Sequence, residues 1–311
     1  MRPTDILVRP SRPPDQVLRY GDRDDQVADL RLPDPGRGAG DARAARQADC
    51  PLVIFLHGGF WRAEFDRAHA GPLAQALASS GFAVCTPEYR RTGQAGGGWP
   101  GTFDDVAAAV DALPEIVAAA AGGGAAAGGQ ADARRVVLAG HSAGGQLALW
   151  AAGRRRLPPG APGYLARSPA AGAGRSPAAG VARSPAGVVS VAGVCDLAAC
   201  FRLKLGGGAA GDLMGGGPER FPGRYLAADP MRLLPTGTTA RLVHGMDDDR
   251  VPPEQSSAYA ARAQGAGDDV ACDLIPGCGH FEVIDPLSAA WPVVLAAFWS
   301  AAAVSGGRRE P

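Results

Sequence analysis

The sequence has almost no lysine, few aromatic residues and no imbalance of charge. Its 31 basic and 31 acidic residues give a formal net charge of zero, and aromatic residues make up 6% of the chain. It contains neither a stripe of basic residues that would neutralise phosphates nor a basic amphipathic helix. We therefore expect no nucleic-acid partner and no membrane partner. Lys204 is the only lysine, and we attach no function to that bias.

Long apolar runs and paired cysteine motifs are also lacking. The N-terminal residues have no apolar signal-peptide core, and no apolar run reaches the roughly 18 residues of a membrane span. The six cysteines show neither Cys-x-x-Cys nor the spacing of a metal site. These absences predict a cytoplasmic protein with reduced cysteines and no metal or cofactor. The composition leaves a monomer and a homodimer open.

A Gly-x-Ser-x-Gly motif lies within residues 136–150, between a short apolar run and a stretch with a helical pattern. A strand that turns at once into a helix strains its central residue, and Gly140 and Gly144 lack the Cβ atoms that would collide there. We therefore expect Ser142 to be a nucleophile and the Ala143 amide to donate to an oxyanion. Because the chain has 45 glycines, the motif alone is also compatible with a plain turn.

Apolar runs alternate with helical patterns from residue 52 onwards. These runs are typical of strands covered on both faces of a sheet, and they comprise residues 52–56, 82–86, 136–139, 188–194, 241–244 and 270–275. An earlier, half-buried strand is expected within residues 26–33. The alternation predicts an α/β fold with a doubly wound, mostly parallel sheet of about eight strands and helices on both faces.

One domain over residues 20–304 accounts for this pattern, with an N-terminal arm over 1–19 and a C-terminal tail over 305–311. Residues 153–187 hold three copies of Arg-Ser-Pro-Ala. We interpret them as a disordered low-complexity insertion, with a regulatory or interaction segment as the alternative. Residues 200–235 mix apolar side chains with glycine runs, which is typical of a mobile cap over a site.

One helix can be delimited from its flanking residues. Thr102-x-x-Asp105 resembles a capping box, in which a hydroxyl and a carboxylate satisfy free backbone donors at a helix start. Apolar residues then recur on one face of the expected helix. Pro114 is expected to kink or end it, because proline cannot donate a backbone hydrogen bond.

A catalytic serine needs a base and a group that orients the base. Of the five histidines, only His280 stands alone in a glycine-rich loop downstream of a loop of carboxylates. We expect His280 to be the base, with a structural loop histidine as the alternative, and we expect His244 at a strand end to be structural. An aspartate near residue 248 would be the acid. This order of serine, aspartate and histidine is the one expected of α/β-hydrolases.

Four motifs stand out together: His57-Gly-Gly-Phe-Trp61, Gly140-His-Ser-Ala-Gly144, His244-Gly-x-x-Asp248-x-x-Val-Pro252 and His280-Phe281. With them the chain resembles the α/β-hydrolase superfamily, and within it the arylformamidase (kynurenine formamidase)-like and carboxylesterase branch. The resemblance runs from about Tyr20 to Phe298, outside the glycine-rich insertions. It aligns Asp248 with the triad acid, which would leave Asp247 and Asp249 as turn residues.

The resemblance also implies that the loop beginning at His57 supplies the second half of an oxyanion hole. Its glycines would let the backbone approach the substrate carbonyl, with the Gly59 or Phe60 amide donating to it. The implied oxyanion-hole residues are Gly58, Gly59, Phe60 and Ala143. Phe60 stands where the formamidase branch more usually has tyrosine, so this loop lacks a hydroxyl group.

The aromatic residues near these motifs are candidates for the walls of a substrate pocket. They are Trp61, Trp99 and Phe281, together with Phe60. For any one of them, packing in the core is the commoner role.

The sequence therefore predicts a cofactor-free serine hydrolase that cleaves a carboxyl ester or a small amide such as an N-formyl aryl amide. Ser142 would attack the carbonyl, His280 would transfer the proton, and Asp248 would orient the imidazole. One alternative is a peptidase resembling prolyl oligopeptidase, which is disfavoured because no propeller-sized N-terminal segment is expected. Another is a non-catalytic ligand-binding protein on the same fold, which would be expected to lack a triad residue.

Overall fold

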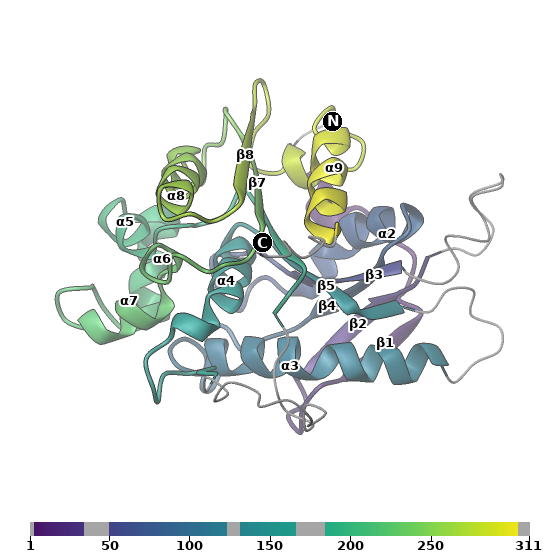
Figure 1. Ribbon diagram of the computed structural model, residues 1–311, viewed down its shortest axis with the longest axis horizontal. Coiled ribbons are helices and arrows are strands. Elements are labelled where there is room, and N and C mark those ends of the chain that lie inside the picture. The colour runs from purple at the N-terminus through teal and green to yellow at the C-terminus, as the bar shows by residue number, and fades with distance from the viewer. Residues whose placement is uncertain (1–2, 34–49, 123–130, 166–183, 304–311) are drawn as a thin grey trace, which may run out of the picture.

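The computed structural model describes residues 3–33, 50–122, 131–165 and 184–303, and it contains an eight-stranded sheet between two layers of helices (Figure 1). The strands are β1 (Gln16–Arg19), β2 (Val27–Arg31), β3 (Cys50–Leu56), β4 (Ala83–Pro87), β5 (Ala131–His141), β6 (Gly187–Val191), β7 (Ala240–Gly245) and β8 (Val270–Ile275). Their spatial order is β1-β2-β4-β3-β5-β6-β7-β8. β2 is antiparallel to both of its neighbours, and the other neighbouring pairs are parallel. The predicted α/β-hydrolase fold with its doubly wound, mostly parallel sheet is confirmed.

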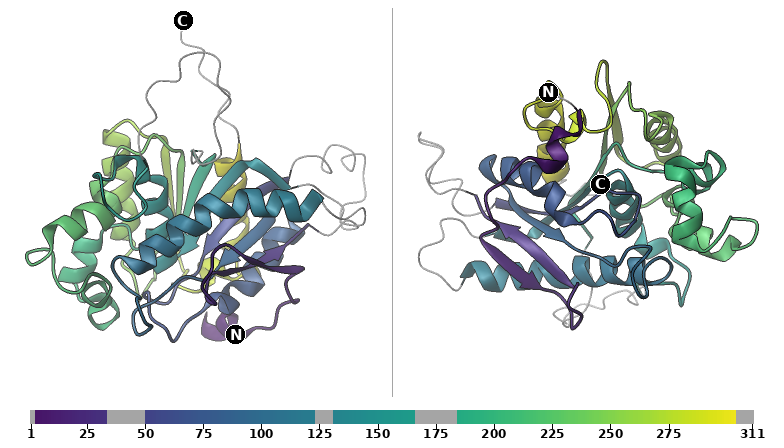
Figure 2. Two further views of the ribbon diagram at one scale, coloured as in Figure 1. Left: turned by 90° about the horizontal axis from the view of Figure 1, so that it is seen from below. Right: turned by 180° about the vertical axis from the view of Figure 1, so that it is seen from behind.

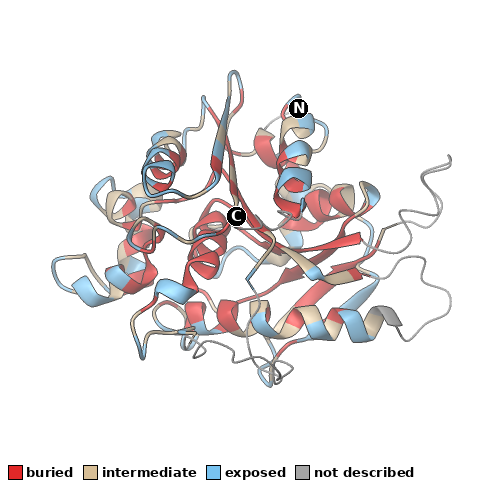
Figure 3. Cartoon of the chain, in the orientation of Figure 1, coloured by how far each residue is buried: buried red, intermediate tan, exposed pale blue. Residues whose placement is uncertain are grey.

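Helices cover both faces of this sheet. α3 (Gly101–Gly122), α4 (Ala143–Ala152) and α8 (Glu254–Gly265) pack on one face, and α2 (Gly71–Ser79) and α9 (Trp291–Ala302) on the other (Figures 1 and 2). Side chains of β3 alternate between the two layers: Leu52, Ile54 and Leu56 join the first, whereas Val53 and Phe55 join the second. Both faces of the central strands are therefore buried (Figure 3), which is why their sequences are apolar without interruption.

The N-terminal segment packs on the domain instead of extending from it. Within the predicted arm of residues 1–19, η1 (Pro3–Val8) buries Ile6 in the apolar cluster of α2 and α9, and β1 pairs with β2. Arg9 donates through Nη2 to the Asp285 carboxylate at 2.7 Å, close to the start of α9. The chain's early residues are thereby tied to its last helix.

α3 differs from its prediction in two respects. It begins one residue before Thr102, and the Asp105 carboxylate pairs with Arg90, at 2.7 Å between Nε and Oδ2, instead of capping the helix start. An ion pair with a neighbouring segment thus takes the carboxylate that a capping box would use. Pro114 lies inside the helix, which continues through an alanine-rich stretch because alanine has the strongest helix propensity.

The region predicted as a cap is helical. It contains α5 (Leu197–Arg202), α6 (Leu205–Met214) and α7 (Pro222–Ala228). Lys204 and residues 206–208 have positive φ, so α6 opens with left-handed backbone, which glycine adopts without a side-chain clash. A Cβ atom on Gly206 would lie 2.6 Å from the ring of Phe60. The helical segment over residues 197–232, for which we keep the name cap, therefore contacts the loop that follows β3.

Residues 153–165, the first part of the predicted insertion, pack against α3. Arg154 is buried, and its two terminal nitrogens donate to the Asp111 carboxylate, each at 2.8 Å. The first two Arg-Ser-Pro-Ala copies and the tail over 305–311 lie outside the described residues. All six cysteines are free thiols. In the described ranges, no helix is long and apolar enough to cross a membrane.

Candidate active site

Ser142 lies at the carboxyl end of β5, where the chain turns directly into α4. Its φ of 56° and ψ of −117° lie outside the regions that residues with a side chain favour. The flanking glycines make this turn sterically feasible. A Cβ atom on Gly144 would lie 1.9 Å from the Leu56 carbonyl oxygen, and one on Gly140 would lie 2.1 Å from the Gly144 carbonyl oxygen. Both glycines are therefore required by the shape of the turn.

The loop of residues 57–61, at the end of β3, lies beside the serine. A Cβ atom on Gly58 would be 3.3 Å from the Ser142 Cβ, so the backbone of the loop passes next to that side chain. Gly59 and Phe60 have φ values of 106° and 50°. Across the described ranges, the backbone N–H groups of Gly59 and Phe60 have no protein acceptor. Both groups are thus available to hydrogen-bond a ligand.

His280 and Asp248 follow the neighbouring strands β8 and β7, and their side chains meet, with Nδ1 2.6 Å from Oδ2. The other carboxylate oxygen accepts from the backbone N–H groups of Arg250 and Val251, each at 2.8 Å. Burial raises the pKa of Asp248, but hydrogen bonds from His244 and His280 outweigh it and hold the pKa well below its ordinary value. An ionised carboxylate only accepts, so Nδ1 of His280 carries a proton and Nε2 of the neutral ring has a free lone pair.

His141, the residue before the serine, connects the nucleophile turn to His280. Its Nε2 donates to the His280 backbone carbonyl at 3.0 Å, and the two rings lie 4.6 Å apart. Burial, followed by the neighbouring His280, keeps the pKa of His141 well below its ordinary value. Within the described residues, no hydrogen bond joins the Ser142 hydroxyl to the His280 ring. Such catalytic bonds often tighten only when substrate is bound.

The three aspartates of residues 247–249 have different surroundings. Asp248 reaches His280, and its carboxylate has no exposed surface. The side chain of Asp249 is 75% exposed and lies 3.4 Å from Arg250, and Asp247 is also exposed. Their exposure agrees with an assignment of both to the surface of the turn.

His244, which was expected to be structural, lies directly against Asp248. Its Nε2 is 3.1 Å from Asp248 Oδ2 and 2.9 Å from the Val251 carbonyl oxygen, while its Nδ1 is 2.7 Å from Ser256 Oγ. The ring is fully buried. Its position four residues before Asp248 in the same motif is the sequence signal that links it to the acid.

Two of the residues predicted to line a pocket lie elsewhere. Trp61 has no exposed surface, and its Nε1 donates to Gln146 on α4 at 3.1 Å, so it supports the helix that follows the serine. Trp99 packs on Phe103, with 5.2 Å between ring centres. It lines a cavity of about 960 Å³ together with residues 158–165, and neither the serine nor the histidine–aspartate pair reaches that cavity.

The other two aromatic residues lie beside the functional loops. The Phe281 ring is 5.1 Å from the ring of His280 and 6.1 Å from that of His141. Phe60 is half-buried against Gly206 of the cap. The structure therefore brings Phe60 and Phe281, but not the two tryptophans, to the surfaces of the loops that hold the candidate catalytic groups.

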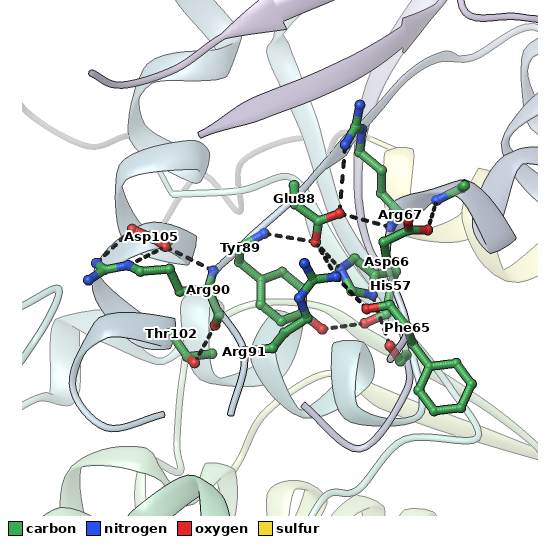
Figure 4. Close-up of polar contacts among 12 residues, drawn as sticks. His57, Phe65, Asp66, Arg67, Glu88, Tyr89, Arg90, Arg91, Thr102 and Asp105 are labelled. Carbon is green, nitrogen blue, oxygen red and sulfur yellow. Dashed lines mark hydrogen bonds and ion pairs between the residues drawn. The ribbon is translucent and has the colours of Figure 1, made fainter. Parts of the chain in front are cut away.

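A buried carboxylate beside loop 57–61 is absent from the sequence-based prediction. Glu88 follows β4, and its Oε1 lies 2.8 Å from His57 Nε2 and 2.9 Å from Arg91 Nη1 (Figure 4). Burial raises the pKa of Glu88, but the hydrogen bond and charge of His57, with the charge of Arg91, lower it below its ordinary value. The charged stretch that follows Pro87 was the only signal for it in the sequence. Among the described residues, no group of three or more His, Cys, Asp and Glu side chains is arranged to hold a metal ion.

The strand order and the strained serine turn between β5 and α4 define an α/β hydrolase. The sequence profile of the BD-FAE family matches residues 42–262. The chain belongs to the BD-FAE family. The matched range includes Ser142 and Asp248 and ends before His280. No curated protein sequence matches the chain.

Several solved esterase structures share the fold. A truncated carbohydrate esterase from gut microbiota has a TM-score of 0.69 at 19% identity, over 94% of this chain and 99% of its own. The bifunctional GH43-CE protein of Bacteroides eggerthii has a TM-score of 0.66 at 20% identity, over 92% of this chain and 37% of its own. The butyrate-bound esterase Est2 of Thermogutta terrifontis has a TM-score of 0.62 at 16% identity, over 92% of both chains.

Proposed function

We propose that the protein is a serine hydrolase that cleaves carboxyl esters through an acyl-enzyme. The observation that carries the proposal is the 2.6 Å contact between Asp248 and His280 Nδ1, at the same edge of the sheet as the strained Ser142 turn. An ionised acid holds the imidazole in the tautomer whose Nε2 takes a proton from a serine hydroxyl. Membership of the BD-FAE family and the fold shared with esterases support this assignment.

Each group has a defined part in the proposed reaction. Ser142 Oγ attacks the ester carbonyl while His280 Nε2 takes its proton, and the oxyanion that forms accepts hydrogen bonds from the Ala143 amide and from Gly59 or Phe60. His280 returns the proton to the leaving alcohol as the C–O bond breaks, which leaves the acyl group on the serine. Water, deprotonated by the same histidine, then releases the acid and restores the serine.

We expect short-chain aryl esters to be the best substrates. Phe60 and Phe281 offer aromatic surface beside the two functional loops, and aromatic rings pack favourably on one another. Among the structural neighbours, one is a carbohydrate esterase and another holds butyrate. N-formyl aryl amides are the amide class we propose, from the likeness of the loop 57–61 sequence to the arylformamidase branch.

Labelling with a fluorophosphonate tests the mechanism. We expect the wild-type protein to be labelled and Ser142→Ala to be unlabelled, with a loss on the order of a million-fold in kcat if the three groups act as a unit. Mass spectrometry of the labelled peptide locates the adduct. An unlabelled wild type that binds aryl esters without turning them over would support the ligand-binding alternative instead.

A substrate panel separates the enzyme alternatives. Specificity constants are measured for p-nitrophenyl acetate and butyrate, N-formylkynurenine and a dipeptidyl anilide. The proposal predicts that the specificity constants are highest for the two esters, lower for the formamide and lowest for the anilide. Faster cleavage of the anilide than of the esters and the formamide would favour the peptidase. A higher specificity constant for the formamide than for the esters would indicate that the protein is mainly an arylformamidase.

A further inference from the structure

Glu88 is buried at a point where three segments meet. It is 4% exposed. One carboxylate oxygen contacts His57 at the start of loop 57–61, as well as Arg91 and the Tyr89 backbone N–H. The other accepts from the backbone N–H of Arg67, which begins η2 (Arg67–Ala70). Figure 4 shows Glu88 between these groups. The surrounding donors keep the carboxylate ionised, so it acts only as an acceptor.

The His57 ring is hydrogen-bonded to an acceptor at each nitrogen. Nε2 lies 2.8 Å from Glu88 Oε1, and Nδ1 lies 2.8 Å from the backbone carbonyl oxygen of Gly58. The ring is therefore held on one side by a carboxylate and on the other by a backbone carbonyl, and these two contacts fix its orientation.

The backbone carbonyl groups of His57 and Gly58, at the start of loop 57–61, are both held by side chains. The Tyr89 hydroxyl donates to the His57 carbonyl oxygen at 2.7 Å, and the Tyr89 ring stacks on His57 with 4.3 Å between centres. His57 itself holds the Gly58 carbonyl. A peptide unit is planar and its C=O and N–H point in opposite directions. Fixing the Gly58 carbonyl therefore fixes the direction of the Gly59 N–H, which has no protein acceptor in the described part of the chain.

We infer that Glu88 is a positioning residue for the oxyanion hole: it holds the His57 ring against the Gly58 carbonyl, and this contact aims the Gly59 N–H at the substrate oxyanion. The inference rests on the proposed function, because an oxyanion forms only if an acyl group is transferred. It assigns Glu88 no contact with substrate. Its effect is on the transition state, where the carbonyl oxygen becomes charged and requires aligned donors.

Glu88→Gln is the direct test, since glutamine keeps the shape of the side chain and removes its charge. We expect kcat for p-nitrophenyl acetate to fall on the order of a hundredfold, the scale expected when a catalytic donor is misplaced by about 1 Å. KM should change little, because the uncharged substrate carbonyl needs the donor less than the oxyanion does. The inhibition constant of an aryl boronic acid, which forms a tetrahedral anion on the serine, should rise by a similar factor.

Asp105→Asn is the matched control. It removes another buried carboxylate, paired with Arg90 in the same region (Figure 4), whose described contacts do not include loop 57–61. We expect it to lower the melting temperature while kcat and the boronic acid inhibition constant stay near the wild-type values. If Glu88→Gln does no more than Asp105→Asn in these two quantities, Glu88 is only structural.

A second variant keeps the test decisive if Glu88→Gln does not fold. Tyr89→Phe retains the stack on His57 and removes the hydroxyl that holds the His57 carbonyl. It should lower kcat and weaken boronic acid binding, by less than Glu88→Gln, with KM again little changed. Unchanged values in a folded Tyr89→Phe protein would overturn the inference. A wild type that no fluorophosphonate labels would instead refute the proposed function.

Discussion

Asp248 is shared by two histidines, and every oxygen lone pair that it offers is used. Oδ2 meets His280 and His244, and Oδ1 meets two backbone N–H groups. A fully satisfied buried carboxylate is rigid as well as ionised. His244, anchored at its Nδ1 by Ser256, thus holds the same carboxylate oxygen that contacts His280.

Asp248→Asn should lower kcat roughly ten-thousand-fold, because an amide group in this position stabilises the wrong imidazole tautomer. Asp249→Asn is the control, since that side chain is exposed and lies outside the contact with His280. Steady-state hydrolysis of an aryl ester compares the two. If Asp247→Asn or Asp249→Asn lost activity while Asp248→Asn remained active, that neighbouring aspartate would be the triad acid instead.

Local signals in the sequence predicted the turn between β5 and α4, because Gly140 and Gly144 lie only two positions from Ser142. Contacts between segments that are distant in the sequence were not predicted. The pairing of Glu88 with His57 depends on β4 lying beside β3 in the sheet, which no short motif records. Trp61 could not be assigned to a pocket or to the core, because an aromatic side chain suits both. For α3, a capping box and an ion pair with Arg90 competed for one carboxylate.

At the scale of elements, the left-handed opening of α6 brings the cap against loop 57–61. Gly206 and Gly208 both have positive φ, but a Cβ atom would meet the Phe60 ring at Gly206 and nothing within 4 Å at Gly208. Each change to alanine should cost about 1–2 kcal/mol of backbone strain. Only Gly206→Ala should also alter KM for aryl esters, by displacing Phe60.

Thermal unfolding and steady-state kinetics of the two alanine variants distinguish these effects. Similar losses of stability, with a change of KM in one variant alone, would show that the contact with Phe60 shapes the substrate site. Equal KM values in both would mean that the cap contact has no influence on substrate binding.

Asp229 joins two elements of the cap and should make the cap sensitive to pH. Its carboxylate accepts from the backbone N–H of Leu197 at the start of α5 and of Met231 in η4 (Pro230–Arg232). Burial, followed by the charge of Asp196, raises its pKa to about 6. The folded state then binds the proton more tightly than the unfolded state, so protonated Asp229 stabilises the fold. This stabilisation is complete below about pH 4 and is lost as pH rises through about 6.

Asp229→Asn should remove this pH dependence of the free energy of unfolding. A pKa of about 6 in place of the ordinary 3.8 corresponds to about 3 kcal/mol. The free energy of unfolding, measured in urea at pH 4.5 and at pH 7.5, should fall with rising pH by less in the variant than in the wild type. Asp268→Asn serves as the control, because Asp268 accepts from backbone groups at Thr236 and Gly237 in another part of the structure. If the free energy of unfolding changed equally in the wild type and in Asp229→Asn between the two pH values, Asp229 would not be the source of the pH dependence.

For the whole molecule, the contact between Arg9 and Asp285 joins segments from opposite parts of the chain. Asp285 lies in the connection between His280 and α9, so this contact also restrains the segment that carries the histidine. Arg9→Ala should lower the free energy of unfolding by about 1–2 kcal/mol, since the pair is mostly buried and charge-assisted. Arg23→Ala, which removes a more exposed pair with Asp25, should have little effect. If urea denaturation showed equal losses of unfolding free energy in Arg9→Ala and Arg23→Ala, the link between the two segments would add no stability.

Lys204, the exposed residue that begins the left-handed turn before α6, is the only side-chain amine in the protein. Apart from the chain terminus, an amine-reactive dye therefore has a single place to attach, and that place is on the cap. The six native thiols can remain untouched. Labelled in this way, the wild-type protein would report the environment of its own cap in a fluorescence experiment, and titration with an aryl boronic acid would reveal whether that environment changes when the serine is occupied.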